Sequence, residues 1–168
     1  MPVATFAKFL PITHVLLDLE VSSKKRLFEQ IGLLIENENK IARATVFDAL
    51  FAREKLGSTG LGHGVAIPHG RIKALREPLA VFIRTKEGVP FEAPDGNPVR
   101  LVFAMLVPEH ATEQHLNLLS ELAQAFSDGE LRDALLAEQD NVRAHDMMIY
   151  GSTTGAGNDT TQRTAAAI

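Results

Sequence analysis

The stretch GSTGLGHGVAIPHGR, from Gly57 to Arg71, says most about which fold this 168-residue sequence adopts. It contains five glycines, two histidines and one proline. Glycine adopts positive φ angles readily, so backbone N–H groups here can approach a ligand closely, and successive N–H groups form a nest that binds anions. Pro68 stiffens the backbone at His69, because its ring fixes φ and removes a donor. The pattern predicts an exposed, firmly held imidazole beside a site for an oxyanion.

Three familiar motifs do not fit this stretch. A P-loop requires a lysine after its glycines, and none follows here. The dinucleotide fingerprint G-x-G-x-x-G, begun at Gly60 and Gly62, would need a third glycine where Val65 stands. The zinc-peptidase pattern H-E-x-x-H is absent from the sequence. The interpretation that remains is a flexible cradle for an oxyanion beside one histidine.

Histidine suits reversible phosphoryl transfer, because a ring with a pKa of about 6.5 is mostly an uncharged nucleophile near neutral pH. Such transfer requires in-line placement and stabilisation of the phosphoryl oxygens. We expect His69 to accept the phosphoryl group. Arg53 can supply a bidentate guanidinium. His115, near the start of a helix that follows a strand, is a second ring that can donate to a phosphate on His69.

The neighbours of these three residues are candidate phosphate ligands. Ser58 and Thr59 offer hydroxyl donors, and Gly60 offers a backbone that can approach a ligand closely. Gly70 leaves room beside the ring of His69. His63 can line the same cavity.

Two interpretations from other functional classes stay open. One is an anion-binding module in which the glycines hold a small anion without covalent chemistry. The other is a metal-dependent hydrolase, although the histidine spacings match no standard ligand pattern. The conceivable metal ligands are His63, His69, His110 and His115, with Glu109 or Glu113.

The composition is that of a globular domain with a substantial core, 45% hydrophobic and 23% charged. The net charge of −4 argues against a general nucleic-acid binder, whereas residues 53–76 form a basic island that suits a small anion. Cysteine is absent, no apolar run is long enough to span a membrane, and the first residues lack the layout of a secretory signal. We therefore expect a cytoplasmic protein without cofactor or membrane insertion.

Alternating helix and strand patterns predict an α/β domain over residues 1–150, followed by a flexible, low-complexity tail over residues 151–168. Ser22 or Ser23 is expected to cap the first helix and Thr45 the second, which Gly57 would end as a left-handed residue. Leu116 is expected to face inward. The predicted strands are residues 13–20, 65–67, 79–85 and 99–107, and the predicted helices are residues 22–37, 45–56, 112–126 and 128–139.

Three segments resemble the enzyme IIA domain of the fructose/mannitol type, from the bacterial sugar phosphotransferase system, and within it the nitrogen-regulatory branch. They are REKLGSTGLGHGVAIPHGRI, SKKRLFEQIGLLI and HLNLLSELAQAF. The resemblance runs from about Phe9 to Asp140, and the residues after it do not resemble the closing helix of the family. His63 also departs, because many relatives have a smaller polar residue there.

The resemblance implies a three-layer sandwich, in which helices cover both faces of a mixed central β-sheet. It implies that His69 is phosphorylated on Nε2 and that Arg53 and His115 flank the phosphoryl group. The implied donor is a histidine-containing phosphocarrier protein, charged from phosphoenolpyruvate by an enzyme I-type kinase. The implied targets are regulated proteins of the sensor-kinase or potassium-transporter type.

The absence of cysteine favours a regulator within this family. Sugar-transporting relatives pass the phosphoryl group to a cysteine on a IIB domain, and this chain has no cysteine and no membrane span. It cannot complete transport alone. We expect a phosphoryl carrier with a mainly regulatory role. A IIA component that works with a separate IIB partner stays an alternative.

Overall fold

A computed structural model describes residues 5–110 and 112–151. Of the predicted tail, all but Gly151 lies outside the described residues. The elements in chain order are η1 (Thr5–Phe9), η2 (Ile12–His14), β1 (Val15–Leu19), α1 (Lys24–Asn39), α2 (Arg43–Glu54), β2 (Gly60–Gly62), β3 (Val65–Ala66), β4 (His69–Ile72), β5 (Leu79–Val89), β6 (Val99–Pro108), α3 (Thr112–Phe126), α4 (Gly129–Ala137) and α5 (Asn141–Tyr150).

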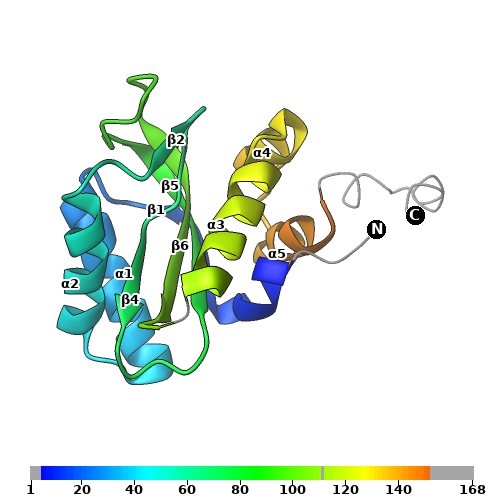
Figure 1. The fold of residues 1–168 in the computed structure, drawn as a ribbon. Helices are drawn as coiled ribbons and strands as arrows, with labels where there is room; N and C mark the ends of the chain where they lie inside the picture. The colour runs from blue at the N-terminus through cyan, green and yellow to red at the C-terminus, as the bar shows by residue number, and fades with distance from the viewer. Residues whose placement is uncertain (1–4, 111, 152–168) are drawn as a thin grey trace.

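The six strands form one mixed sheet in the order β1-β5-β6-β3-β2, and β4 also pairs with β6. The long strands β5 and β6 are antiparallel, whereas β1 runs parallel to β5, and both β3 and β4 run parallel to β6. Helices α1 and α2 cover one face, and α3, α4 and α5 lie on the other (Figure 1). The predicted three-layer α/β sandwich is confirmed.

Strand β6 supplies side chains to both cores, which explains its unbroken apolar sequence. Leu101 and Phe103 belong to the cluster beneath α3, α4 and α5, whereas Val102 and Ala104 belong to the cluster beneath α1 and α2. A strand that is covered on both faces needs no alternation of polar and apolar residues. In the part of the chain that the structure describes, no helix is both long and apolar enough to cross a membrane.

The caps of the first two helices differ in origin. Ser23 caps α1 as predicted, since its Oγ accepts a hydrogen bond from the backbone N–H of Arg26. The prediction that Thr45 caps α2 is wrong. Helix α2 begins two residues earlier, because Glu36 of α1 accepts hydrogen bonds from the backbone N and the Nε of Arg43. A side chain from the preceding helix thus satisfies a donor that a local cap would otherwise serve.

The end of α2 also differs from the prediction. The residue after the helix, Lys55, keeps a right-handed conformation, and Gly57 follows with a φ of 155°. Gly57 is therefore not the left-handed capping residue that we expected. Its unusual φ instead marks the point where the chain turns from the helix into the glycine stretch.

At the start of α3, the inward face is displaced by one residue from the predicted one. Leu116 is 62% exposed, whereas Leu118 and Leu122 are buried. The buried face continues toward the start of the helix through His115, because residues three and four apart share a helix face. The displacement therefore turns His115 inward and leaves Leu116 in solvent.

Helix α5 was not predicted. It packs Ala144, Met147 and Met148 into the core beneath α3 and α4. Asn141 donates from Nδ2 to the carbonyl of Val15, and His145 Nε2 lies 2.7 Å from the carbonyl of Leu10. The helix thus joins the end of the described chain to the first strand and to the turns before it.

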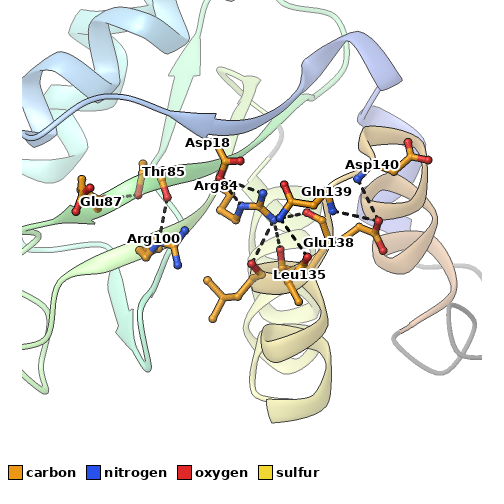
Figure 2. Close-up of polar contacts among 11 residues, drawn as sticks. Asp18, Arg84, Thr85, Glu87, Arg100, Leu135, Glu138, Gln139 and Asp140 are labelled. Atoms are coloured by element: carbon orange, nitrogen blue, oxygen red, sulfur yellow. Dashed lines mark hydrogen bonds and ion pairs between the residues drawn. The ribbon is translucent and has the colours of Figure 1, made fainter.

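Arg84 holds the end of α4 against the sheet. Its side chain is almost fully buried, and Figure 2 shows it extending from β5 toward α4. Nη1 donates to the carbonyls of Leu135, Leu136 and Glu138, and Nη2 lies 3.0 Å from Oδ1 of Asp18 on β1. A cation at the C-terminal end of a helix is favourable because the unpaired carbonyls there carry partial negative charge.

Candidate functional site

The glycine stretch does not form one open loop. It folds into β2, β3 and the start of β4; β2 pairs with β3, and β3 and β4 each pair with β6. A cavity of about 710 Å³ lies between this stretch, α2 and α3. Its lining includes His69, His115 and Arg53, so the structure brings the three main candidate residues together.

Gly70 brings α2 close to β4. A Cβ at this position would lie 2.6 Å from the carbonyl oxygen of Ala49, which is far inside van der Waals contact. Only glycine therefore permits this approach. Arg53 follows Ala49 by one helical turn, on the same face of α2. The room that we predicted beside His69 is in fact filled by the helix, and the close packing places Arg53 at the cavity.

His69 opens β4, and its ring is held in one orientation. Nδ1 lies 2.8 Å from the carbonyl oxygen of Ile67. Because a carbonyl only accepts, Nδ1 carries the proton and donates. Nε2 then has the lone pair, and it has no hydrogen-bond partner among the described residues. The residue is only 7% exposed, so the prediction of an exposed ring is wrong, and access to it runs through the cavity.

The surroundings of His69 favour its neutral form. Burial lowers the pKa of His69, because a charged imidazolium loses its hydration there. The hydrogen bond to Ile67 acts in the opposite sense but by less, and the cationic Arg53 and Arg71 lower the pKa further. An uncharged ring at neutral pH is the nucleophilic form.

His115 lies on α3 with its ring against that of His69. The two rings meet edge to face, with 5.1 Å between their centroids. Burial lowers the pKa of His115 to about 4, with further contributions from His69, Arg71 and Arg53. Its Nδ1 is the only buried side-chain nitrogen or oxygen of the described residues without a hydrogen-bond partner. Such an orphaned group at a cavity is consistent with a partner supplied by a ligand.

Arg53 stands at the C-terminal end of α2, half-buried. Nη1 donates to the carbonyl of Gly57, at 2.8 Å. This bond fixes the guanidinium against the start of the glycine stretch. Its remaining N–H groups have no bond to another described residue, so they can serve an anion in the cavity.

The hydroxyl groups of Ser58 and Thr59 line the cavity but are engaged with the protein. Ser58 Oγ donates to the carbonyl of Phe91 and accepts from the backbone N–H of Gly60. Thr59 Oγ1 donates to Oε1 of Glu54, at 2.6 Å. In this arrangement Ser58, Thr59 and Gly60, three of the four residues that we expected to bind phosphate, shape one wall of the cavity.

Glu54 is a buried carboxylate that the sequence did not single out. It accepts from the backbone N–H and the hydroxyl of Thr59, and its Oε2 lies 3.0 Å from Nζ of Lys24. It ties the glycine stretch to α2 and to the start of α1. The available signal was its position as the one acidic residue in the basic island of residues 53–76.

The other histidines do not join the site. His63 is exposed with a φ of 57°, and its backbone N–H donates to Asp95. It does not line the cavity, contrary to our expectation. His110 is exposed beside Glu109. Within residues 5–110 and 112–151, no three histidine or carboxylate side chains gather as metal ligands would. The hydrolase interpretation therefore has no metal centre in this part of the chain.

Comparisons with known proteins agree with the fold. The sequence model of the family "Phosphoenolpyruvate-dependent sugar phosphotransferase system, EIIA 2" matches residues 8–148. A nitrogen regulatory protein from Pseudomonas aeruginosa is 45% identical over 121 residues, which cover 71% of this chain and 79% of the relative. A fructose-specific EIIA component from Haloferax volcanii is 30% identical over 149 residues, which cover 88% and 97%.

A solved structure gives the same result. The crystal structure of the nitrogen regulatory protein IIA-Ntr from Neisseria meningitidis has a TM-score of 0.81 and 52% identity, and the match covers 85% of this chain and 98% of that one. The family match also extends past Asp140, where we expected the resemblance to end, and includes most of α5.

Proposed function

Since this chain belongs to the EIIA 2 family of the phosphoenolpyruvate-dependent sugar phosphotransferase system, we propose that it carries a phosphoryl group on Nε2 of His69 and regulates other proteins according to that state. One observation carries the proposal. The bond from Nδ1 to the carbonyl of Ile67 leaves Nε2 as the lone-pair nitrogen, at a cavity with a second neutral ring and a guanidinium.

The proposed donor is a phosphohistidine on a phosphocarrier protein. The lone pair of His69 Nε2 attacks phosphorus, a new N–P bond forms, and the donor's N–P bond breaks with its electron pair returning to the donor nitrogen. The proton on Nδ1 of His69 stays in place, held by Ile67. Because the phosphoryl unit passes between two similar nitrogens, the step is reversible.

Arg53 and His115 are the proposed ligands of the transferred group. The transition state spreads negative charge over the phosphoryl oxygens, so positioned donors around them lower the barrier. Arg53 contributes a fixed cation. His115 contributes a neutral ring with one N–H donor, because its pKa of about 4 keeps it uncharged at neutral pH.

The proposed output is recognition of the phosphorylated surface. A phosphoryl group adds up to about −2 charge. The cavity that would hold it is rimmed by exposed apolar side chains, notably Leu56 at 84% and Leu116 at 62% exposure. A partner docked on this rim would meet a different charge in each state. The regulated targets, the phosphocarrier donor and the cytoplasmic location stay predictions.

A sugar-transport role is the second candidate. The similarity to a fructose-specific EIIA component supports it. In that case the phosphoryl group on His69 would pass to a cysteine of a separate IIB partner, since this chain has none. The two roles share the acceptor and differ in the next recipient, so a purified fructose-type IIB protein would distinguish them by whether it takes label from this chain.

Labelling tests the proposal. The chain is incubated with radiolabelled phosphoenolpyruvate, an enzyme I-type kinase and a histidine-containing phosphocarrier. We expect acid-labile, base-stable label on the parent and none on His69→Gln. His110→Gln is the matched control, because His110 is an exposed histidine outside the cavity, and it should label like the parent. Equal labelling of His69→Gln and the parent would contradict the assignment.

A further inference from the structure

Arg71 is a second guanidinium at the cavity. It lies on β4 two residues after His69, and residues at this spacing on a strand project from the same face. It lines the same cavity as His69, His115 and Arg53. Both histidines sense its charge, because Arg71 is among the causes that lower the pKa of each.

The charges around the cavity match a doubly charged anion. Arg53 and Arg71 carry the only formal charges among the described residues that line it, since both rings are neutral near pH 7. The buried carboxylate of Glu54 is paired with Lys24. A phosphoryl group on histidine carries up to about −2 charge. Arg53 offers one positive charge to the phosphoryl oxygens, and Arg71 offers a second.

The side chain of Arg71 is exposed but anchored. Nη1 donates to the carbonyl oxygen of Glu109, at 3.0 Å, in the segment that joins β6 to α3. The bond holds the guanidinium near the helix that carries His115. Nη2 and Nε make no bond to another described residue, so they are available to a ligand at the open side of the cavity.

We propose that Arg71 binds the phosphoryl oxygens on phosphorylated His69 and, with Arg53, stabilises the dianionic group. The inference rests on the proposed phosphorylation of His69. A guanidinium at the open side would favour the phosphorylated state of this chain over that of its donor. It would also favour the dianion over the monoanion, because opposite charge favours the ionised form of a neighbouring acid.

The test compares Arg71→Gln with Lys73→Gln. Both substitutions remove one positive charge from an exposed side chain in the same segment, but Lys73 does not line the cavity. Each variant is mixed with a fixed ratio of phosphocarrier, phosphoenolpyruvate and kinase, and the equilibrium ratio of phosphorylated to free protein is measured. We expect Arg71→Gln to lower that ratio about three- to tenfold, as for one partly exposed charge-assisted bond. Lys73→Gln should change it less than about twofold.

A spectroscopic readout separates phosphate binding from a structural role. The ³¹P resonance of the phosphohistidine is followed against pH. We expect the protonation midpoint of the phosphohistidine to rise in Arg71→Gln and to stay unchanged in Lys73→Gln. Loss of the bond to Glu109 alone would not move this midpoint. Arg71→Lys keeps the charge but loses the planar fork, so both of its readouts should fall between those of Arg71→Gln and the parent. It replaces Arg71→Gln as the test variant if Arg71→Gln fails to fold.

The outcomes are distinct. If the parent takes no label, the proposed function fails and the role of Arg71 fails with it. If the parent is labelled, but Arg71→Gln and Arg71→Lys match Lys73→Gln in both readouts, the role of Arg71 is overturned while the acceptor role of His69 stands.

Discussion

The imidazole rings of His69 and His115 meet edge to face, with 5.1 Å between centroids and 90° between ring planes. Each residue is 7% exposed. Neither ring forms an ion pair with a carboxylate among the residues that the structure describes. Two neutral rings in contact, flanked by guanidinium groups, disfavour protonation of either ring and leave positive charge beside them, as the proposed binding of a phosphoryl group requires.

The depressed pKa of His115 makes stability depend on pH. In the unfolded chain this ring takes up a proton near pH 6.5, whereas in the folded protein it does so only near pH 4. Between these values the unfolded state binds more protons, so stability falls as pH falls through this window. We expect the Tm of the parent to drop more steeply from pH 6.5 to 4 than that of His115→Gln. Parallel Tm profiles for the two proteins would count against the buried, neutral ring.

Gly70→Ala tests the close approach of α2 to β4. The added Cβ would meet the carbonyl of Ala49 at 2.6 Å, so the helix must move. We expect a loss of about 2 kcal/mol in the free energy of unfolding, measured in urea, and slower labelling because Arg53 moves with α2. Gly129→Ala is the control. There the new Cβ approaches only the flexible end of Arg132, so stability should stay within about 1 kcal/mol of the parent. Similar losses in both variants would refute the close-packing explanation.

Glu54→Gln tests the bonds that hold the glycine stretch. The change removes the ion pair with Lys24 and weakens two bonds from Thr59. We expect destabilisation of about 1–3 kcal/mol in urea unfolding, since the group is buried and fully bonded. Glu29→Gln, which breaks an exposed pair with Arg26, should cost less than about 1 kcal/mol. If the two variants lose equal stability, Glu54 has no special role.

Arg84→Lys separates stability from chemistry. A lysine cannot reproduce the planar fork that donates to Leu135, Leu136 and Glu138 (Figure 2). We expect a loss of about 2–3 kcal/mol in unfolding free energy. Labelling at roughly room temperature, where the variant stays folded, should be unchanged. Arg100→Lys, which affects one bond to Thr85, should lose about 1 kcal/mol or less. Impaired labelling of folded Arg84→Lys would indicate that this contact also shapes the site.

Runs of apolar residues, and apolar residues at helical spacing, predicted most of the fold. Residues 79–85 and 99–107 are rich in β-branched and aromatic side chains, and both form strands. Helix α5 escaped prediction because its buried residues, Ala144, Met147 and Met148, are few and lie among polar neighbours. The start of α2 escaped because its cap comes from Glu36 on another helix. Long-range contacts of this kind leave no local signal.

The site was predicted in its residue types more than in its geometry. The glycines and Pro68 marked the stretch that carries His69, and the structure brings Arg53 and His115 to it. Burial of the ring could not be read from the sequence, because α2 and α3, which are distant in the chain, form two walls of the cavity. The engagement of Ser58 and Thr59 depends on Phe91 and Glu54, which come together only in the folded protein.

The identity of the phosphorylated nitrogen tests the central claim most directly. The ¹⁵N-labelled chain is phosphorylated from phosphoenolpyruvate, and the ¹⁵N and ³¹P spectra of its histidines are recorded before and after. The account predicts a proton on Nδ1 of free His69 and phosphorus on its Nε2 afterwards, with the bond to Ile67 retained. Phosphorus on Nδ1, or on any other residue while His69 stays free, would contradict it.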